Sequence, residues 1–310
     1  MIHQDPKRIA VIGGMNMDIG GRAENRLQLR DSNPGVVSLR PGGVGRNIAQ
    51  NLRLLGAEVS LLSAVGDDAF GRELLASCEV LGMDLSMTLR RPRERSSTYL
   101  YVTDDDGDML FAVSDMDIVD RITPEALAPL LERLNSFDAV VMDANLSRAS
   151  LCFLAEKLSV PLYADPVSTV KAEKLVPILH RLRALKPNSL EARCLTGEKE
   201  AVRAARSLLE RGVQRVLLSL GAEGMLAAEG ERVLRLARQK VAVVNTTGAG
   251  DAATAAMVWA DLQGLDLETT ARFSQTAGAL TCQCAEANSS ELAKLPERFG
   301  LGCPESGSDL

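Results

Sequence analysis

The stretch from residue 241 to residue 257 constrains the fold more than any other part of the chain. It opens with Val-Ala-Val-Val, an apolar and largely β-branched run in which we predict a buried strand. Thr-Gly-Ala-Gly-Asp follows as a turn, and the alanine-rich run after it has good helix propensity. The sequence therefore predicts a strand–turn–helix unit, which is the building block of α/β proteins.

The turn itself, Gly248 to Asp251, has the properties of an anion site. The first N–H groups of the helix lack intrahelical partners and lie at the positive end of the helix dipole. Glycine lets the backbone approach a ligand closely. Two interpretations of Asp251 stay open at this point. It either caps the helix, or takes a proton from a hydroxyl nucleophile while the N–H groups bind a moving phosphoryl group.

Two further glycine-rich stretches lie far upstream. Pro-Gly-Gly-Val-Gly-Arg-Asn at residues 41–47 opens a predicted helix, which has apolar residues at helical spacing and ends at Gly56. Gly-Gly-Met-Asn-Met-Asp at residues 13–18 follows the apolar run 9–12, which reads as a buried parallel strand. Asn16 and Asp18 thus follow the end of a strand, where open α/β sheets bind their ligands.

From about residue 120 onward, predicted strands and helices alternate. Polar residues recur where the predicted strands end, and these are Asp143, Asn145, Asp165, Asn188, Glu191, Ser219 and Gly221. Because carboxyl ends of parallel strands meet at one edge of a sheet, we expect a doubly wound sheet with its site at that edge.

Composition excludes several classes of function. The chain has 310 residues, 46% hydrophobic, and a net charge of -6, so it has no basic footprint for nucleic acid. No apolar run is long enough to cross a bilayer, and the first residues lack the apolar core of a secretion signal. The 6 cysteines show no metal-binding spacing and read as reduced thiols. We therefore expect a cytoplasmic enzyme without a nucleic-acid or membrane partner.

The glycine-rich stretches together resemble the two signatures of the ribokinase-like (PfkB) family of carbohydrate and nucleoside kinases, and residues 13–18 resemble that family's opening. The resemblance runs from about residue 8 to about residue 290. It implies an α/β fold, with a doubly wound, mostly parallel sheet flanked by helices and a small β-sheet lid. The expected organisation is one kinase domain over residues 1–300, with the lid formed by residues 15–40 and 95–115, and a disordered tail at 301–310.

The resemblance also implies roles for particular residues. Asp251 would be the general base, and the backbone of Gly248, Ala249 and Gly250 the anion hole. Asn16 and Asp18 would bind sugar hydroxyls, and Asp31 and Asn33 would lie on or beside the lid, near the base. The other residues expected at the substrate are Gly42, Gly43, Asn47, Ser97, Thr98 and Asn145.

For the phosphoryl donor, the family implies ATP with Mg2+. The residues expected at ATP are Asn188, Ser219, Gly221, Gly224, Thr247, Gly248, Gly250 and Asn288. Asp165 and Glu191 would hold the metal through water, although Glu191 also suits a plain helix-start acid. Many relatives carry an aspartate six residues before the catalytic one, to serve a monovalent cation. This chain has Asn245 there, so potassium activation is expected to be weak or absent.

Within the family, residues 31–35 and 41–52 look most like pseudouridine kinase, which implies phosphorylation of the 5′-hydroxyl of pseudouridine. Two alternatives stay open: a kinase of ribose, adenosine or uridine, and a non-catalytic nucleoside sensor. The intact set from Gly248 to Asp251 argues against a sensor, which has no need of a base. The family also implies a homodimer formed through the lid, and the apolar hairpin at 97–113 fits that expectation.

Overall fold

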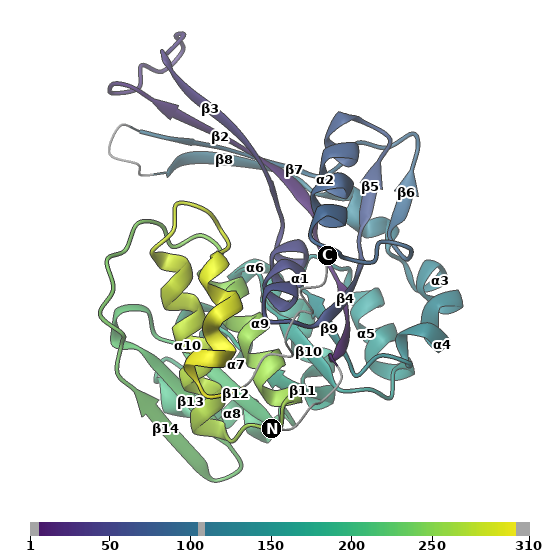
Figure 1. Cartoon of the computed structure of the whole chain (residues 1–310), viewed down its shortest axis with the longest axis vertical. Helices are drawn as coiled ribbons and strands as arrows, with labels where there is room; N and C mark the ends of the chain where they lie inside the picture. The colour runs from purple at the N-terminus through teal and green to yellow at the C-terminus, as the bar shows by residue number, and fades with distance from the viewer. Residues whose placement is uncertain (1–5, 105–108, 302–310) are drawn as a thin grey trace, which may run out of the picture.

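The computed structural model describes residues 6–104 and 109–301. Most of the acidic turn of the 97–113 hairpin and all but the first residue of the expected tail lie outside the described residues. Two main sheets are present, a large central one and a smaller one that projects from it (Figure 1). The central strands are β1 (Arg8–Ile12), β4 (Glu58–Leu62), β9 (Ala139–Asp143), β10 (Leu162–Asp165), β11 (Leu182–Leu185), β12 (Arg215–Ser219), β13 (Met225–Glu229) and β14 (Arg232–Leu236).

The central sheet has the order β14-β13-β12-β11-β10-β9-β1-β4. All neighbours from β12 to β4 pair in parallel, and at one edge β13 pairs antiparallel with both β12 and β14. The chain steps from β1 outward to β4 and then returns to the other side of β1 with β9. That reversal creates a crevice at the carboxyl ends of the strands, where such sheets bind ligands.

Helices cover both faces of this sheet. The α-helices are α1 (Val44–Leu54), α2 (Ala69–Val80), α3 (Pro124–Leu127), α4 (Leu131–Leu134), α5 (Arg148–Lys157), α6 (Thr169–Ala172), α7 (Ser189–Thr196), α8 (Ala201–Glu210), α9 (Ala249–Leu262), α10 (Leu267–Cys282) and α11 (Leu295–Arg298). The 3-10 helices are η1 (Asp117–Arg121), η2 (Ala128–Leu130), η3 (Glu173–Arg181), η4 (Gly221–Glu223) and η5 (Ser290–Lys294).

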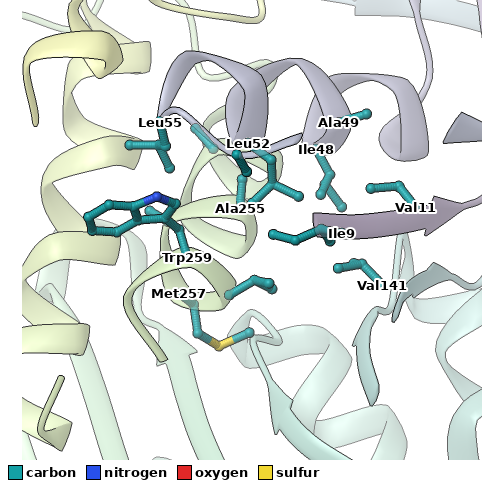
Figure 2. Close-up of a cluster of buried hydrophobic side chains, with 14 of the residues drawn as sticks. Ile9, Val11, Ile48, Ala49, Leu52, Leu55, Val141, Ala255, Met257 and Trp259 are labelled. Carbon is teal, nitrogen blue, oxygen red and sulfur yellow. The ribbon is translucent and has the colours of Figure 1, made fainter. Parts of the chain in front are cut away.

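Successive strand residues pack into two separate cores, because side chains alternate across a sheet. In β1, Ile9 and Val11 belong to the cluster that includes α1, α9 and α10. Ala10 and Ile12 belong to the cluster on the other face, with α5 and α8. Figure 2 shows the first cluster, where Trp259 of α9 packs with α1 and with the strands below.

Helix α9 is the best anchored of these helices, and it carries Asp251 in its first turn. Its residues from Ala252 to Ala260 are all buried, as expected for a helix that is apolar on every side. At its far end, Asp261 accepts hydrogen bonds from the Tyr163 hydroxyl at 2.6 Å and from Arg183 at 2.8 Å. These bonds hold the helix in place over the sheet, so the helix start is a fixed platform.

The smaller sheet has the order β3-β2-β7-β8, and its position agrees with the predicted lid (Figure 1). Its strands are β2 (Asn16–Ala23), β3 (Gly35–Gly42), β7 (Thr98–Thr103) and β8 (Met109–Asp115). A third pair, β5 (Ala64–Gly66) and β6 (Leu89–Arg91), lies beside α2. Because β2 follows β1 after only three residues, the lid is tied directly to the centre of the main sheet.

The strand predicted at residues 241–244 is wrong. This run is an irregular connection between β14 and α9, and Val243 and Val244 are 62% and 63% exposed. Val241 and Val243 line a cavity, so they face an open space where a strand would face a sheet neighbour. An apolar β-branched run can therefore form either a buried strand or a loop that lines a cavity, and the local sequence does not distinguish the two. Among the described residues, no helix is both long and apolar enough to cross a membrane.

Candidate active site

The start of α9 has the backbone geometry predicted for the Thr-Gly-Ala-Gly-Asp turn. Gly248 is the N-cap residue, with φ of 78°, a conformation that L side chains rarely adopt. A Cβ added there would also overlap the carbonyl of Ala287. The Ala249 N–H contacts the Thr246 carbonyl at 3.3 Å. Glycine at 248 is therefore required by the turn itself, and it exposes the helix N-terminus toward the cavity.

Asp251 does not cap this helix, which excludes one of the two interpretations left open by the sequence. It lies at the third helical position, and its Oδ2 accepts a hydrogen bond from Asn47 Nδ2 at 2.9 Å. Asn47 comes from the first turn of α1, so the two glycine-rich helix starts meet at this pair. Asn288 donates to the Asn47 carbonyl at 3.3 Å. Three predicted site residues thus lie together.

The electrostatic surroundings of Asp251 suit a proton acceptor. Burial, and after it the charge of Asp165, raise the pKa of its carboxyl to about 8, against the opposing influence of Asn47 and Lys186. A pKa near the working pH is what a general base needs, because the group must gain and release a proton easily. The same combination of burial and charge partners marks functional sites.

Asn16 and Asp18 form the second polar pair, at the base of the lid. Asn16 Nδ2 donates to Asp18 Oδ1 at 2.6 Å, and burial raises the pKa of Asp18. A Cβ on Gly42 would overlap the Asp18 carboxylate, so glycine at this position makes room for that side chain. Ser97 is 1% exposed, and its hydroxyl has no hydrogen-bond partner among the described residues. A buried hydroxyl without a hydrogen-bond partner costs free energy. We therefore interpret this wall of the site, at the base of the lid, as one where a ligand would supply the missing hydrogen bond.

Asp143 supports this wall although it was not predicted as a site residue. It is 1% exposed and accepts from the backbone N–H groups of Gly14 and Asn145, at 2.8 and 2.9 Å. A Cβ on Gly13 would overlap its carboxylate. The signal was available in the sequence, because Asp143 ends a buried strand, but its partner Gly14 lies 129 residues away in the chain.

Five of the eight residues predicted at ATP line one side of a cavity of about 830 Å³, and Gly248 and Asn288 are not among its lining residues. Asn188, Ser219, Gly221, Gly224 and Gly250 all lie in its wall, together with Asp251. Thr246 lines it in place of the predicted Thr247, whose N–H is bonded to Asn245 Oδ1 at 3.0 Å.

The two glycines of this wall differ in their physical role. A Cβ on Gly224 would overlap the carbonyl of Leu236, so that glycine serves the close approach of the strands. A Cβ on Gly221 would meet nothing, which leaves its backbone open to the cavity.

The two carboxylates predicted at the metal already have protein partners. Glu191 and Asn188 form a capping box, with the Asn188 N–H donating to Glu191 Oε2 at 2.9 Å. Asp165 accepts from the Thr254 hydroxyl at 2.7 Å and from the Val167 N–H at 2.8 Å. Across the described part of the chain, no group of three or more His, Cys, Asp or Glu residues is placed to hold a metal. Asp165 and Glu191 therefore fit binding of a metal through bridging water better than direct coordination by protein ligands alone.

Lys186 is the main residue that the sequence analysis missed on this side. It is 5% exposed, lines the cavity, and its Nζ would lie 3.4 Å from a Cβ on Gly250. Its cation lowers the pKa of both Asp251 and Glu191. The signal was its position directly after a buried strand and before Pro187-Asn188. A buried ammonium beside a helix N-terminus makes this end of the cavity attractive to an anion.

Asp31 and Asn33 lie away from these groups. They belong to the 24–34 turn at the far end of the lid, five strand residues beyond Asp18, or roughly 17 Å at the usual rise per residue. Asn33 Nδ2 donates to the carbonyls of Gln28 and Asp31, at 2.9 and 3.0 Å. In this conformation both residues hold the turn closed, and neither joins the site at the base of the lid.

Sequence comparison agrees with this geometry. The model of the pfkB family carbohydrate kinases matches residues 6–294. The chain is 36% identical over 293 residues to a pseudouridine kinase of Escherichia coli (strain K12), covering 92% of this chain and 93% of that protein. It is 27% identical over 254 residues to a guanosine-inosine kinase of Exiguobacterium acetylicum, covering 79% and 84% of the two chains.

Solved structures show the same fold. A ribokinase from Thermotoga maritima superposes with a TM-score of 0.83 at 21% identity, covering 94% of this chain and 99% of that one. Arabidopsis thaliana ribokinase complexed with ribose and ATP gives a TM-score of 0.80 at 23% identity, with the same coverage.

The fold, the paired helix starts and these matches agree with one another. They show an enzyme that transfers a phosphoryl group to a hydroxyl acceptor, as the sequence predicted. The match to the same kinase family supports ATP as the phosphoryl donor. The roles of single residues are proposals. The chain belongs to the pfkB family of carbohydrate kinases.

Proposed function

We propose that this protein is a pseudouridine kinase, which transfers the γ-phosphoryl group of ATP to the 5′-hydroxyl of pseudouridine. The observation that carries the catalytic part is the Asp251–Asn47 pair, which joins the two glycine-rich helix starts at the mouth of the cavity. The choice of pseudouridine is supported by the 36% identity to a pseudouridine kinase over nearly the full length of both chains.

In the proposed reaction, Asp251 takes the proton of the 5′-hydroxyl as the hydroxyl oxygen attacks the γ-phosphorus. The bond from that phosphorus to the bridging β–γ oxygen breaks, and the electron pair leaves with ADP. The N–H groups at the start of α9 and the Lys186 ammonium stabilise the negative charge on the transferring oxygens. Asn47 orients the base by its hydrogen bond to Asp251.

The other predicted residues have supporting roles in this proposal. Asp18 and Asn16 accept and donate hydrogen bonds to vicinal ribose hydroxyls, and the lid excludes water, which competes as an acceptor. Asp165 and Glu191 would hold Mg2+ through water, and the ion would neutralise phosphate charge. The charges around Glu191 support the assignment, because burial, and then the charge of Asp165, raise the pKa of Glu191, and a cation near both carboxylates would relieve this repulsion.

The test is ADP release with MgATP against pseudouridine, uridine, ribose and adenosine. Preferred turnover of pseudouridine is the expected result. Preferred turnover of ribose or adenosine would keep the chemistry and overturn the choice of acceptor. Nucleoside binding without ADP release from any acceptor would favour the sensor interpretation.

We expect little activation by potassium. Asn245 takes the place of an aspartate that serves a monovalent cation in relatives, and both ends of its amide are used within the loop. Nδ2 donates to the Ala285 carbonyl at 3.2 Å, and Oδ1 accepts from Thr247. Initial rates with potassium replaced by tetramethylammonium should change by less than about twofold, a difference below ~0.4 kcal/mol. Asn245→Asp is the matched variant, and it should gain potassium dependence. A strong dependence in the wild type would contradict this prediction.

We also propose a homodimer formed through the lid. The lid exposes a row of apolar side chains on β8, among them Met109, Phe111 and Val113, which are 59%, 48% and 59% exposed. A contiguous exposed apolar surface of this kind marks an interaction site. Sedimentation equilibrium should show a dimer that the double substitution Phe111→Asp, Val113→Asp converts to a monomer. Val80→Asp, at a still more exposed apolar residue of α2, should stay dimeric. A monomeric wild type at all concentrations would rule the dimer out.

A further inference from the structure

Lys171 makes a short contact with the acceptor side of the site, although no predicted role included it. It lies on α6, the short helix that follows β10, and it is half-buried. Its Nζ donates to Asn145 Oδ1 at 2.6 Å. Asn145 is 8% exposed and follows β9, next to the wall that contains Asn16 and Gly14.

This contact determines which way the Asn145 amide points. An ammonium has three donors and no acceptor, so it pairs with the amide oxygen and never with the amide NH2. The NH2 group then faces the opposite direction, where Nδ2 would lie 2.6 Å from a Cβ on Gly14. Burial raises the pKa of Asp143, and a side-chain hydrogen bond from Asn145 opposes that rise, which places the carboxylate on the NH2 side. Lys171 and Asp143 therefore fix the amide from its two ends.

The backbone of Asn145 is held as firmly as its side chain. Its N–H donates to Asp143 Oδ1 at 2.9 Å. Lys174 Nζ reaches the carbonyls of Ala144, Asn145 and Leu146, at 3.1, 3.4 and 3.0 Å. An amide fixed in this way offers its NH2 group, and not its oxygen, to a ligand, because turning the amide over would break the charge-assisted hydrogen bond with Lys171.

We propose that Lys171 is a positioning residue that makes Asn145 an N–H donor to the base of the phosphoryl acceptor. The inference rests on the proposed function. A fixed donor selects a ring that carries a carbonyl oxygen beside its bond to the ribose, as pseudouridine and uridine do. It contributes nothing to binding of free ribose, which lacks a base.

Lys171→Met tests the proposal, because it keeps the length of the side chain and removes the ammonium. The amide is then free to turn its oxygen toward the base. The KM for pseudouridine should rise about 3- to 10-fold, which corresponds to one net hydrogen bond. The kcat and the KM for ATP should change less than about twofold, and Lys171→Arg should restore the KM. The ratio of kcat/KM for pseudouridine to that for ribose should fall by the same factor.

Asn145→Asp provides a second variant. The carboxylate keeps the pairing with Lys171 as an ion pair, but it has no N–H to offer. Because an oxygen then faces the carbonyl of the base, binding of pseudouridine should weaken by at least about tenfold. Calorimetric titration of pseudouridine in the absence of ATP measures this binding without turnover.

Lys174→Met is the matched control. It removes a cation from the same segment, but one that bonds backbone carbonyls and not the amide of Asn145. The variant should unfold at a lower temperature and keep the wild-type ratio of pseudouridine to ribose. A merely structural role of Lys171 would make Lys171→Met behave in the same way.

The failure of the inference is distinguishable from that of the proposed function. If the wild type phosphorylates pseudouridine and Lys171→Met keeps the ratio to ribose, the role of Lys171 is wrong and the proposed function stands. If the wild type phosphorylates ribose but not pseudouridine, the proposed acceptor is wrong and the inference falls with it.

Discussion

Asp251→Asn should lower kcat by about 10²- to 10⁴-fold, the range typical of a lost general base. The amide has the same size as the carboxylate and still offers an oxygen to Asn47, so the KM values for ATP and for the nucleoside should change little. Steady-state kinetics with pseudouridine measure both quantities. Asp67→Asn is the control, since that carboxylate is 70% exposed and pairs with Arg72 on the surface. A variant that keeps more than about a tenth of the wild-type kcat would show that Asp251 is not the base.

The same residue should set the pH dependence of both activity and stability. With both substrates below saturation, kcat/KM reports groups of the free enzyme, and it should rise with pH until the carboxyl is ionised near pH 8. The pKa of Asp251 is raised in the folded state, so the folded protein keeps this proton to a higher pH than the unfolded chain. The free energy of unfolding therefore decreases as pH rises from about 4 to about 8.

Asparagine does not titrate, so Asp251→Asn removes that decrease. The variant should unfold at a higher temperature than the wild type at pH 8, and at a similar temperature at pH 4. Thermal unfolding followed by circular dichroism at the two pH values checks this. A variant less stable than the wild type at pH 8 would mean that the carboxylate is stabilised in its ionised form.

Gly42→Ala is the second substitution with a large expected effect. An added Cβ would overlap the Asp18 carboxylate, so the side chain must leave the position from which it binds ribose hydroxyls. Loss of hydrogen bonds to a charged group should lower kcat/KM for the nucleoside by about 10²-fold. The KM for ATP should change less than about twofold, because neither Gly42 nor Asp18 lines the cavity that contains the predicted ATP residues.

Gly21→Ala separates this steric effect from a general weakening of the lid. Gly21 lies in β2, the same lid strand as Asp18, and a Cβ there would lie 3.6 Å from the nearest atom of Val102, an ordinary contact. That variant should keep the wild-type kcat/KM. Equal losses in the two variants would show that the lid as a whole, and not the Asp18 carboxylate, had been disturbed.

How far the site could be predicted differs between its parts. The helix starts at Gly43 and Gly248, the strand ends with polar residues and the 97–113 hairpin of the lid were predicted, because each depends on a few neighbouring residues, whereas β2 was not predicted as a strand. Asp251 was recognised from the sequence, with two possible roles, helix cap and general base. Asp31 and Asn33 were assigned to the base by resemblance, but in the structure the side chain of Asn33 holds the 24–34 turn, and that of Asp31 accepts from the neighbouring Ser32 N–H. Lys171 was overlooked because no local pattern separates it from a surface lysine, and Lys186 was overlooked although it directly follows a buried strand.

The sequence alone determined the features that arise within a short stretch of chain. A glycine that must adopt positive φ, an unpartnered helix N-terminus and a run of apolar residues are local properties, and they led to the α/β fold and to Asp251. The tertiary structure decided which of these features meet. It paired Asn47 with Asp251 across 204 residues, and it turned residues 241–244 from a predicted strand into a cavity wall. It also placed Lys171 within hydrogen-bond distance of Asn145. Such contacts depend on strand order and close packing, which bring together residues whose own neighbourhoods carry no sign of each other.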